Sequence, residues 1–245
     1  MEKLKYFFRG TEDGFTFKLF SPIHLILLAI FVAGILLIRF KFDKKTVAKM
    51  NKTLAIILLI DQVILYIWQF SSGYFRIDMS LPLYHCRVAV WFLIIGILFN
   101  QRIIKITGFY LGFIGSIIGM LLADLYKFSF PHYTNFQFFI VHIFMGLMVA
   151  GLLFAEREPV TKKEIKSVAI ALNILNAIIM LANIVLIRTY PEVNYGYFLS
   201  LPNGMGPYIP PVLNAIIMLI VFNLGLWIIY RLLNKVMRED RNESN

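Results

Sequence analysis

LFSPIHLILLAIFVAGILLI, residues 19–38, is the stretch that decides the fold, because it is long, apolar and free of charged side chains. A helix needs about 20 mostly apolar residues to cross a bilayer. Backbone groups surrounded by lipid must be hydrogen-bonded within the chain, so this run is expected to be a transmembrane helix. It follows about 18 polar and aromatic residues and lacks a small-residue cleavage site, so we expect it to be retained and not removed as a signal peptide.

Six further apolar runs follow, and together the seven predict an all-α, polytopic membrane helix bundle. The connections are too short for a soluble domain, so we expect one membrane domain over residues 1–245. The composition agrees, with 59% hydrophobic residues, 16% charged residues and a mean hydropathy of +0.74. Strands of a membrane β-barrel would alternate over about ten residues, and no stretch of this sequence does. The predicted helices cover residues 19–38, 54–70, 81–99, 106–123, 136–154, 168–187 and 209–230.

The basic residues are shared unevenly between the predicted loops, and this asymmetry predicts the orientation. Cytoplasmic loops carry an excess of lysine and arginine. Of the 24 such residues, sixteen fall on the side of the C-terminus and seven on the opposite side, with Arg87 inside a helix. In a plasma membrane we therefore expect the C-terminus inside, and the N-terminus with the loops 71–80, 124–135 and 188–208 outside. The net charge of +10 then indicates basic loops on anionic lipid, not a nucleic-acid-binding protein.

Ionisable residues within the predicted spans are the first candidates for function, because burying them in a membrane is costly. In the predicted topology all four histidines, at positions 24, 85, 132 and 142, lie in the outer half of the protein. A lone histidine in a helix is more often structural, and we interpret His24 in that way. Asp61 lies roughly 13 Å from the outer end of its helix at 1.5 Å per residue. We expect it to face the bundle interior and to pair with a polar group of another helix.

Cys86 is the only cysteine, which excludes an internal disulfide and a cysteine-based metal site. We expect no metal and no cofactor. A cysteine attacks as its thiolate, a nearby histidine can accept its proton, and a carboxylate can orient that histidine. Ser80 and Pro82 predict a helix start just before Cys86, and His85 and Arg87 would offer charge to a phosphate. On its own, a membrane cysteine is more often a small apolar packing residue.

Two further patterns predict packing inside the bundle. Asn173, Asn176 and Asn183 are spaced by three and seven residues, so they share one face of a helix, and we expect interhelical hydrogen bonds there. Glycines recur at every third or fourth position of the run 106–123 and predict close helix packing. These glycines are Gly108, Gly112, Gly115 and Gly119.

Three segments taken together resemble one family. They are LPLYHCR at 81–87, FPH at 130–132 followed by FFIVH at 138–142, and NY at 194–195 with GPY at 206–208. This ordered set resembles the YwaF-like integral membrane proteins of low-GC Gram-positive bacteria, whose animal relative is transmembrane protein 164. The resemblance covers most of the chain. Many relatives have histidine directly after Leu-Pro-Leu, where this chain has a tyrosine and then a histidine.

The resemblance implies an enzyme. The animal member is a cysteine-dependent phospholipid acyltransferase that moves a fatty acyl chain from a diacyl phospholipid onto a lysophospholipid, so membrane phospholipids and lysophospholipids are the expected partners. Its catalytic cysteine and histidine fall on Cys86 and His142 here, and the expected site lies at the outer leaflet. The expected supporting residues are Asp61, His85, Arg87, Asp124 and His132, and the expected substrate-binding residues are Asn194, Tyr195 and Tyr208.

Other functions stay open at this point. A small-solute transporter would need polar residues along both halves of the membrane, and the inner half has mostly single asparagines, which argues against it. A retinal-binding seven-helix receptor is excluded, because the run 209–230 contains no lysine. A non-enzymatic lipid-binding protein is compatible with the whole sequence, and the oligomeric state is not predicted.

Overall fold

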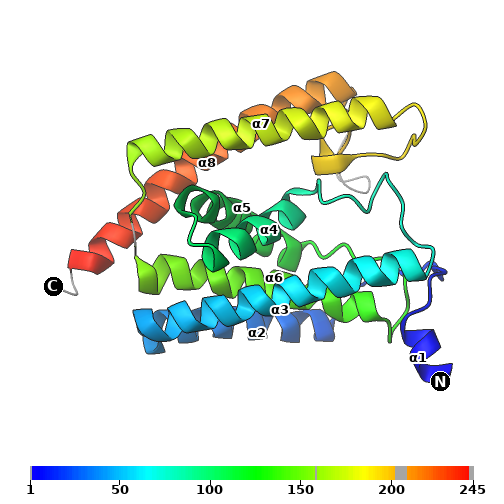
Figure 1. Ribbon diagram of the computed structural model, residues 1–245, viewed down its shortest axis with the longest axis horizontal. Helices are drawn as coiled ribbons and strands as arrows, with labels where there is room; N and C mark the ends of the chain where they lie inside the picture. The colour runs from blue at the N-terminus through cyan, green and yellow to red at the C-terminus, as the bar shows by residue number, and fades with distance from the viewer. Residues whose placement is uncertain (1, 158, 202–208, 243–245) are drawn as a thin grey trace. The chain divides into compact units, whose positions relative to one another are not determined.

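The computed structural model describes residues 2–157, 159–201 and 209–242, the last five of these by backbone alone. Within these residues the chain is helical and has no strands (Figure 1), so the predicted all-α class is confirmed. The chain divides into two compact units. Unit 1 comprises residues 1–75 and 89–158, and unit 2 comprises residues 76–88 and 159–245. The expectation of a single membrane domain stays a prediction.

Six of the described helices are long and apolar enough to cross a membrane, and a shorter apolar helix makes the seventh. The predicted bundle of about seven helices is confirmed in these terms. The six are α2 (Pro22–Lys41), α3 (Lys44–Ser71), α5 (Arg102–Leu121), α6 (Tyr133–Gly151) with its π-helical continuation η1 (Leu152–Glu156), α7 (Lys162–Leu186) and α8 (Pro211–Asn242), and the shorter one is α4 (His85–Leu98). Two short helices, α1 (Glu2–Phe7) and η2 (Tyr195–Tyr197), were not predicted.

Capping residues, and not hydrophobicity, set the start of several helices. Helix α3 was predicted to begin at residue 54 but begins at Lys44. The Asp43 carboxylate caps it there by accepting a hydrogen bond from the Thr46 N–H at 2.8 Å. Helix α7 begins before the predicted residue 168, because Thr161 and Glu164 form a capping box. Both caps lie among charged residues, which a hydropathy pattern assigns to loops.

Unit 1 is built around α6, against which α2, α3 and α5 all pack. In the apolar window of α6, 61% of the residues are buried, compared with 17% in α2, so α2 presents most of its surface to lipid. The glycines of α5 allow close approach, as predicted. A Cβ atom on Gly108 would lie 2.8 Å from the backbone nitrogen of Leu93 in α4. Any side chain at this position would push the two helices apart.

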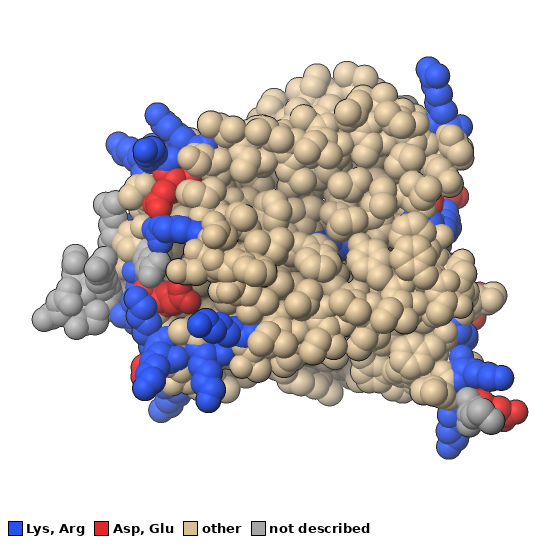
Figure 2. Space-filling model, viewed as in Figure 1, with Lys and Arg blue, Asp and Glu red and all other residues tan. Residues whose placement is uncertain are grey.

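Charged side chains gather at the ends of the helices, and the visible surface between these ends is almost entirely uncharged (Figure 2). At one end of unit 1, Lys105 and Glu156 form a salt bridge of 3.1 Å. The guanidinium of Arg39 lies 4.8 Å from the centre of the Phe154 ring at the same end. Between the ends, large apolar side chains such as Ile67 are exposed. A surface of this kind is typical of a protein surrounded by lipid.

Unit 2 contains the long helices α7 and α8, which asparagine side chains connect. Asn173 and Asn223 each donate from Nδ2 to the other's Oδ1, at 2.9 and 3.0 Å. Nearer the C-terminus, Asn234 of α8 pairs with both the N–H and the carbonyl oxygen of Val160, at 2.7 and 3.1 Å. The predicted interhelical hydrogen bonds are confirmed for Asn173 and also for Asn176, which binds His85 of α4. Asn183 binds the backbone of Tyr195 in η2.

The connection between α5 and α6 supplies a test of the predicted orientation. Lys127 is exposed there, and Lys45 is exposed at the opposite end of the same unit. In a Cys86→Ala background, we expect Lys127→Cys to react with an impermeant maleimide on intact cells, because the basic asymmetry places this connection outside. Lys45→Cys should react only after permeabilisation. The reverse labelling pattern would overturn the predicted orientation.

Candidate active site

The start of α4 is fixed by a side chain from its own first turn. Arg87 donates from Nη1 to the carbonyl oxygens of Met79 and Ser80, at 2.9 and 3.0 Å. These carbonyl groups are therefore engaged outside any helix, and α4 begins only at His85. The predicted start, at residue 81 with Ser80 and Pro82 as its signals, was wrong for this reason. The charge of Arg87, which the sequence assigned to a phosphate, holds the preceding loop instead.

Tyr195 of η2 braces the same loop. Its hydroxyl donates a short hydrogen bond to the carbonyl oxygen of Ile77 and accepts one from the N–H of Leu81 at 3.1 Å. The Tyr195 backbone is paired twice with the Asn183 side chain of α7, each time at 2.8 Å. Burial raises the pKa of the Tyr195 hydroxyl, so it stays protonated and can donate. Its role in substrate binding stays a prediction.

His85, the first residue of α4, is enclosed by groups from α7, η2 and α8. Its Nε2 lies 2.9 Å from Oδ1 of Asn176. Because an amide oxygen only accepts, Nε2 carries the proton and Nδ1 keeps its lone pair. The imidazole packs on the Phe222 ring, with 4.2 Å between the ring centres. At Gly196, where φ is +65°, an added Cβ would lie 2.9 Å from Cε1 of His85, so the turn fits closely around the ring.

Cys86 follows in the same turn of α4 as a free, partly buried thiol. Within the described residues, unit 2 contains five of the predicted site residues, which are His85, Cys86, Arg87, Asn194 and Tyr195. The predicted partner of the cysteine, His142, belongs to unit 1. The pairing of Cys86 with His142 stays a prediction.

His142 of α6 is buried, and one hydrogen bond sets its tautomer. Its Nδ1 lies 2.7 Å from the carbonyl oxygen of Phe138, so Nδ1 must donate and Nε2 keeps its lone pair. No group within the described residues forms a hydrogen bond with this Nε2. The ring fits against Gly119 of α5, where an added Cβ would lie 2.2 Å from Cδ2 and 2.5 Å from Nε2. The basic nitrogen thus lies where α5 has no side chain.

The other two histidines have both ring nitrogens engaged. His24 accepts at Nδ1 from the N–H of Phe20 at 2.8 Å and donates from Nε2 to the carbonyl oxygen of Met120 at 2.7 Å. His132 donates from Nε2 to the carbonyl oxygen of Arg9 at 3.0 Å, and its Nδ1 caps the first turn of α6. The structural interpretation of His24 is confirmed. The observed contacts of His132 are structural as well.

Asp61 faces polar groups of α6, as predicted. Its Oδ2 accepts from Nε2 of Gln62 and from Nε2 of Gln137, both at 3.0 Å. The Tyr133 hydroxyl lies 3.4 Å from the other carboxylate oxygen. The expected pairing with another helix is therefore confirmed. Asp61 does not orient His142, since Nδ1 of that histidine is bound to a backbone carbonyl group.

The remaining predicted site residues lie in connections. Asn194 organises its own loop, since it donates to the carbonyl oxygen of Ser200 at 2.9 Å and accepts from the N–H of Leu199 at 3.0 Å. Asp124 is exposed in the connection between α5 and α6. Tyr208, with the rest of the GPY segment, lies outside the described residues.

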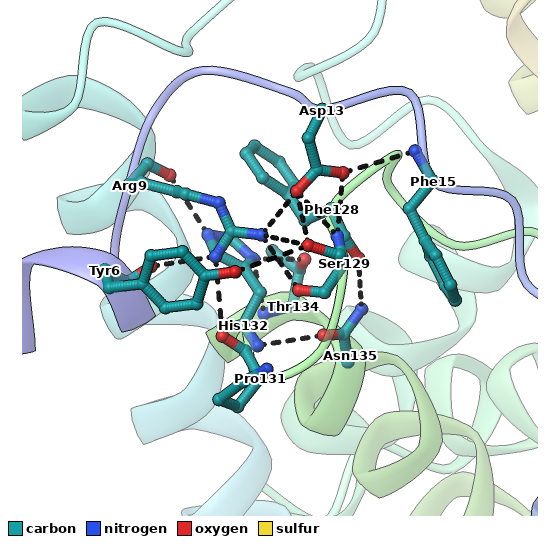
Figure 3. A network of polar contacts seen from close by, with 10 residues as sticks. All are labelled: Tyr6, Arg9, Asp13, Phe15, Phe128, Ser129, Pro131, His132, Thr134 and Asn135. Carbon is teal, nitrogen blue, oxygen red and sulfur yellow. Dashed lines mark hydrogen bonds and ion pairs between the residues drawn. The ribbon is translucent and has the colours of Figure 1, made fainter. Parts of the chain in front are cut away.

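Within unit 1, a polar clasp of Arg9, Asp13, Ser129 and His132 fastens the N-terminal segment to the connection between α5 and α6 (Figure 3). Arg9 donates to the carbonyl oxygen of Ser129 and to the Asp13 carboxylate, both at 2.8 Å. Hydrogen bonds from Ser129 and Arg9 lower the pKa of Asp13. Desolvation lowers the pKa of His132 to about 4, so its ring is neutral at physiological pH. The clasp has no signal in the sequence, because Arg9 and Ser129 are 120 residues apart and no motif joins them.

The clasp is expected to loosen in acid. His132 has a pKa of about 4 when the N-terminal segment is attached and 6.5 as its ordinary value, so as the pH falls His132 binds a proton more readily when the segment is detached. Its contribution to attachment is complete above pH 6.5 and is lost as the pH falls towards 4. Backbone hydrogen-exchange protection in residues 6–13 should decrease over this range and stay constant above pH 7. Protection that is unchanged down to pH 4 would contradict this.

Gly119→Ala is expected to disturb His142. The added methyl group would overlap the imidazole, and such overpacking typically costs about 1–3 kcal/mol. We expect a lower midpoint of thermal unfolding in detergent. Gly225→Ala in α8 is the matched control, because nothing lies within 4 Å of a Cβ there. A Gly119→Ala protein as stable as the control would show that His142 does not pack against this glycine.

A family model described as TMEM164 family matches residues 19–234 of the chain. No curated protein and no solved structure matches it. The matched range contains Cys86 and His142, and it begins after the clasp residues Arg9 and Asp13.

Proposed function

Since the chain belongs to the TMEM164 family, we propose that it is a membrane acyltransferase that forms a thioester on Cys86 with His142 as general base. It would move a fatty acyl chain from a phospholipid to a lysophospholipid at the outer leaflet. The observation that best supports this is the tautomer of His142. A general base needs an available lone pair, and the hydrogen bond from Nδ1 to Phe138 leaves that lone pair on Nε2.

The proposed reaction has two halves. In the first, Nε2 of His142 accepts the thiol proton of Cys86, and Sγ attacks the ester carbonyl carbon of the phospholipid. The bond to the glycerol oxygen breaks, that oxygen takes the proton, and a lysophospholipid leaves. In the second, the hydroxyl of an acceptor lysophospholipid attacks the thioester carbonyl carbon, the C–S bond breaks, and the acceptor's proton ends on sulfur. A membrane site limits competition from water.

Intact-protein mass spectrometry after incubation with a diacyl phospholipid tests this proposal. The expected result is an added mass of one acyl chain that hydroxylamine removes. The adduct should be absent from Cys86→Ala and should form more slowly in His142→Ala. Release of lysophospholipid without any adduct on Cys86 would contradict the thioester. Bound phospholipid without any release would instead favour a lipid-binding protein.

A further inference from the structure

We propose that His85 is a second base in this reaction, one that accepts the hydroxyl proton of the acyl acceptor, and that Asn176 is the positioning residue that fixes its tautomer. This inference rests on the proposed acyl transfer. The four histidines differ in their hydrogen bonds. His24 and His132 have both ring nitrogens engaged, whereas His85 and His142 each donate through one nitrogen and keep a lone pair on the other.

The surroundings of His85 favour function over packing. A fully buried histidine used for packing is expected to engage both ring nitrogens, as His24 does. His85 is only partly buried, and its Nδ1 has no hydrogen bond from the described residues. Nε2–H of His85 donates to Oδ1 of Asn176, whose side chain is 1% exposed. The Phe222 ring and the close turn at Gly196 then hold the imidazole in one place. What remains is a fixed ring with a basic Nδ1.

The position of His85 in α4 indicates which proton it serves. It directly precedes Cys86, and the rise between them is only about 1.5 Å along the helix. Neighbouring side chains on a helix point in different directions, so His85 is poorly placed to take the thiol proton itself. It lies instead at the level where the acyl group would be held on sulfur. The acceptor must approach at this level.

In the proposed transfer step, the O–H proton of the acceptor moves to Nδ1 of His85, and the acceptor oxygen attacks the thioester carbonyl carbon. The C–O bond forms, the C–S bond breaks to leave the Cys86 thiolate, and the proton held on His85 reaches that thiolate through water. His142 is thus the general base when Cys86 is acylated, and His85 is the general base when the acyl chain is transferred to the acceptor. General-base catalysis of this kind contributes about 10²–10⁴-fold to a rate.

His85→Gln separates the base from the packing residue. The glutamine amide N–H can replace Nε2–H in the hydrogen bond to Asn176, but it supplies no basic nitrogen. The variant is first acylated with a diacyl phospholipid and is then given a lysophospholipid, while mass spectrometry follows the adduct. We expect acylation of Cys86 within about twofold of wild type, and transfer to the acceptor slowed by about 10²-fold.

Two asparagines of α7 provide the matched comparison. Asn176→Leu should also slow transfer, by a smaller factor of about tenfold, because the ring loses its fixed tautomer. Asn173→Leu, also in α7, removes the pair with Asn223 of α8 and should leave both steps unchanged. Transfer at the wild-type rate in His85→Gln, or equal slowing of both steps, would overturn this role while leaving the thioester intact. If wild type forms no adduct, the proposed function and this inference fail together.

Discussion

Cys86→Ala is expected to lose all measurable acyl transfer and still fold, because the chain contains no other thiol. Cys86→Ser should keep little activity, since a hydroxyl is a far weaker nucleophile without a strong base. Removing a covalent nucleophile costs roughly 10³-fold or more in rate. The measurement is transfer of a labelled acyl chain from phospholipid to lysophospholipid in proteoliposomes.

Thermal unfolding in detergent serves as the control for Cys86→Ala. The side chain is partly buried and forms no disulfide, so the alanine variant should unfold within a few degrees of wild type. Full activity in Cys86→Ala would end the cysteine mechanism. It would leave a histidine-based mechanism as the better reading of the site.

Asn183→Leu is expected to have the largest effect on stability. Asn183 is fully buried, and its side chain satisfies both the N–H and the carbonyl oxygen of Tyr195. Leucine would leave these two backbone groups unpaired, at a cost of about 1–3 kcal/mol for each. The substitution should also disturb the position of Cys86, because the Tyr195 hydroxyl is hydrogen-bonded to Ile77 and Leu81 in the loop that leads into α4.

The matched control for Asn183→Leu is Asn173→Leu, on the same helix. Asn173 is exposed and pairs only side chain to side chain with Asn223, besides a bond to its own helix. We expect a large fall in the thermal midpoint for Asn183→Leu and little change for Asn173→Leu. The rate at which a membrane-permeant maleimide alkylates Cys86 would show whether the loop leading into α4 has loosened, and it should rise in Asn183→Leu. Equal midpoints for the two variants would show that the Tyr195 pairing does not support the fold.

The long apolar runs were enough to predict the helices, because lipid leaves the backbone no other way to satisfy its hydrogen bonds. Their ends were harder to predict. Asp43 and Thr161 extend α3 and α7 into charged sequence through local caps, which spacing could have indicated. The late start of α4 could not be predicted, because it depends on where the guanidinium of Arg87 points.

The candidate site divides in the same way. Depth in the membrane singled out Asp61, and its expected partnership with another helix was correct, because a carboxylate there must be paired. Spacing showed that Asn176 and Asn183 share a face, but not that one binds His85 and the other Tyr195. The tautomers of the histidines depend on contacts that no sequence pattern contains.

The N-terminal segment also limits how far the chain can be shortened. The indole N–H of Trp68 donates to the carbonyl oxygen of Phe8 at 3.1 Å, and the imidazole of His132 donates to that of Arg9. Trimming to the family-matched residues 19–234 would keep every described catalytic candidate, yet it would take the acceptor away from both rings. A fragment cut to the catalytic candidates is therefore expected to be less stable than the full chain.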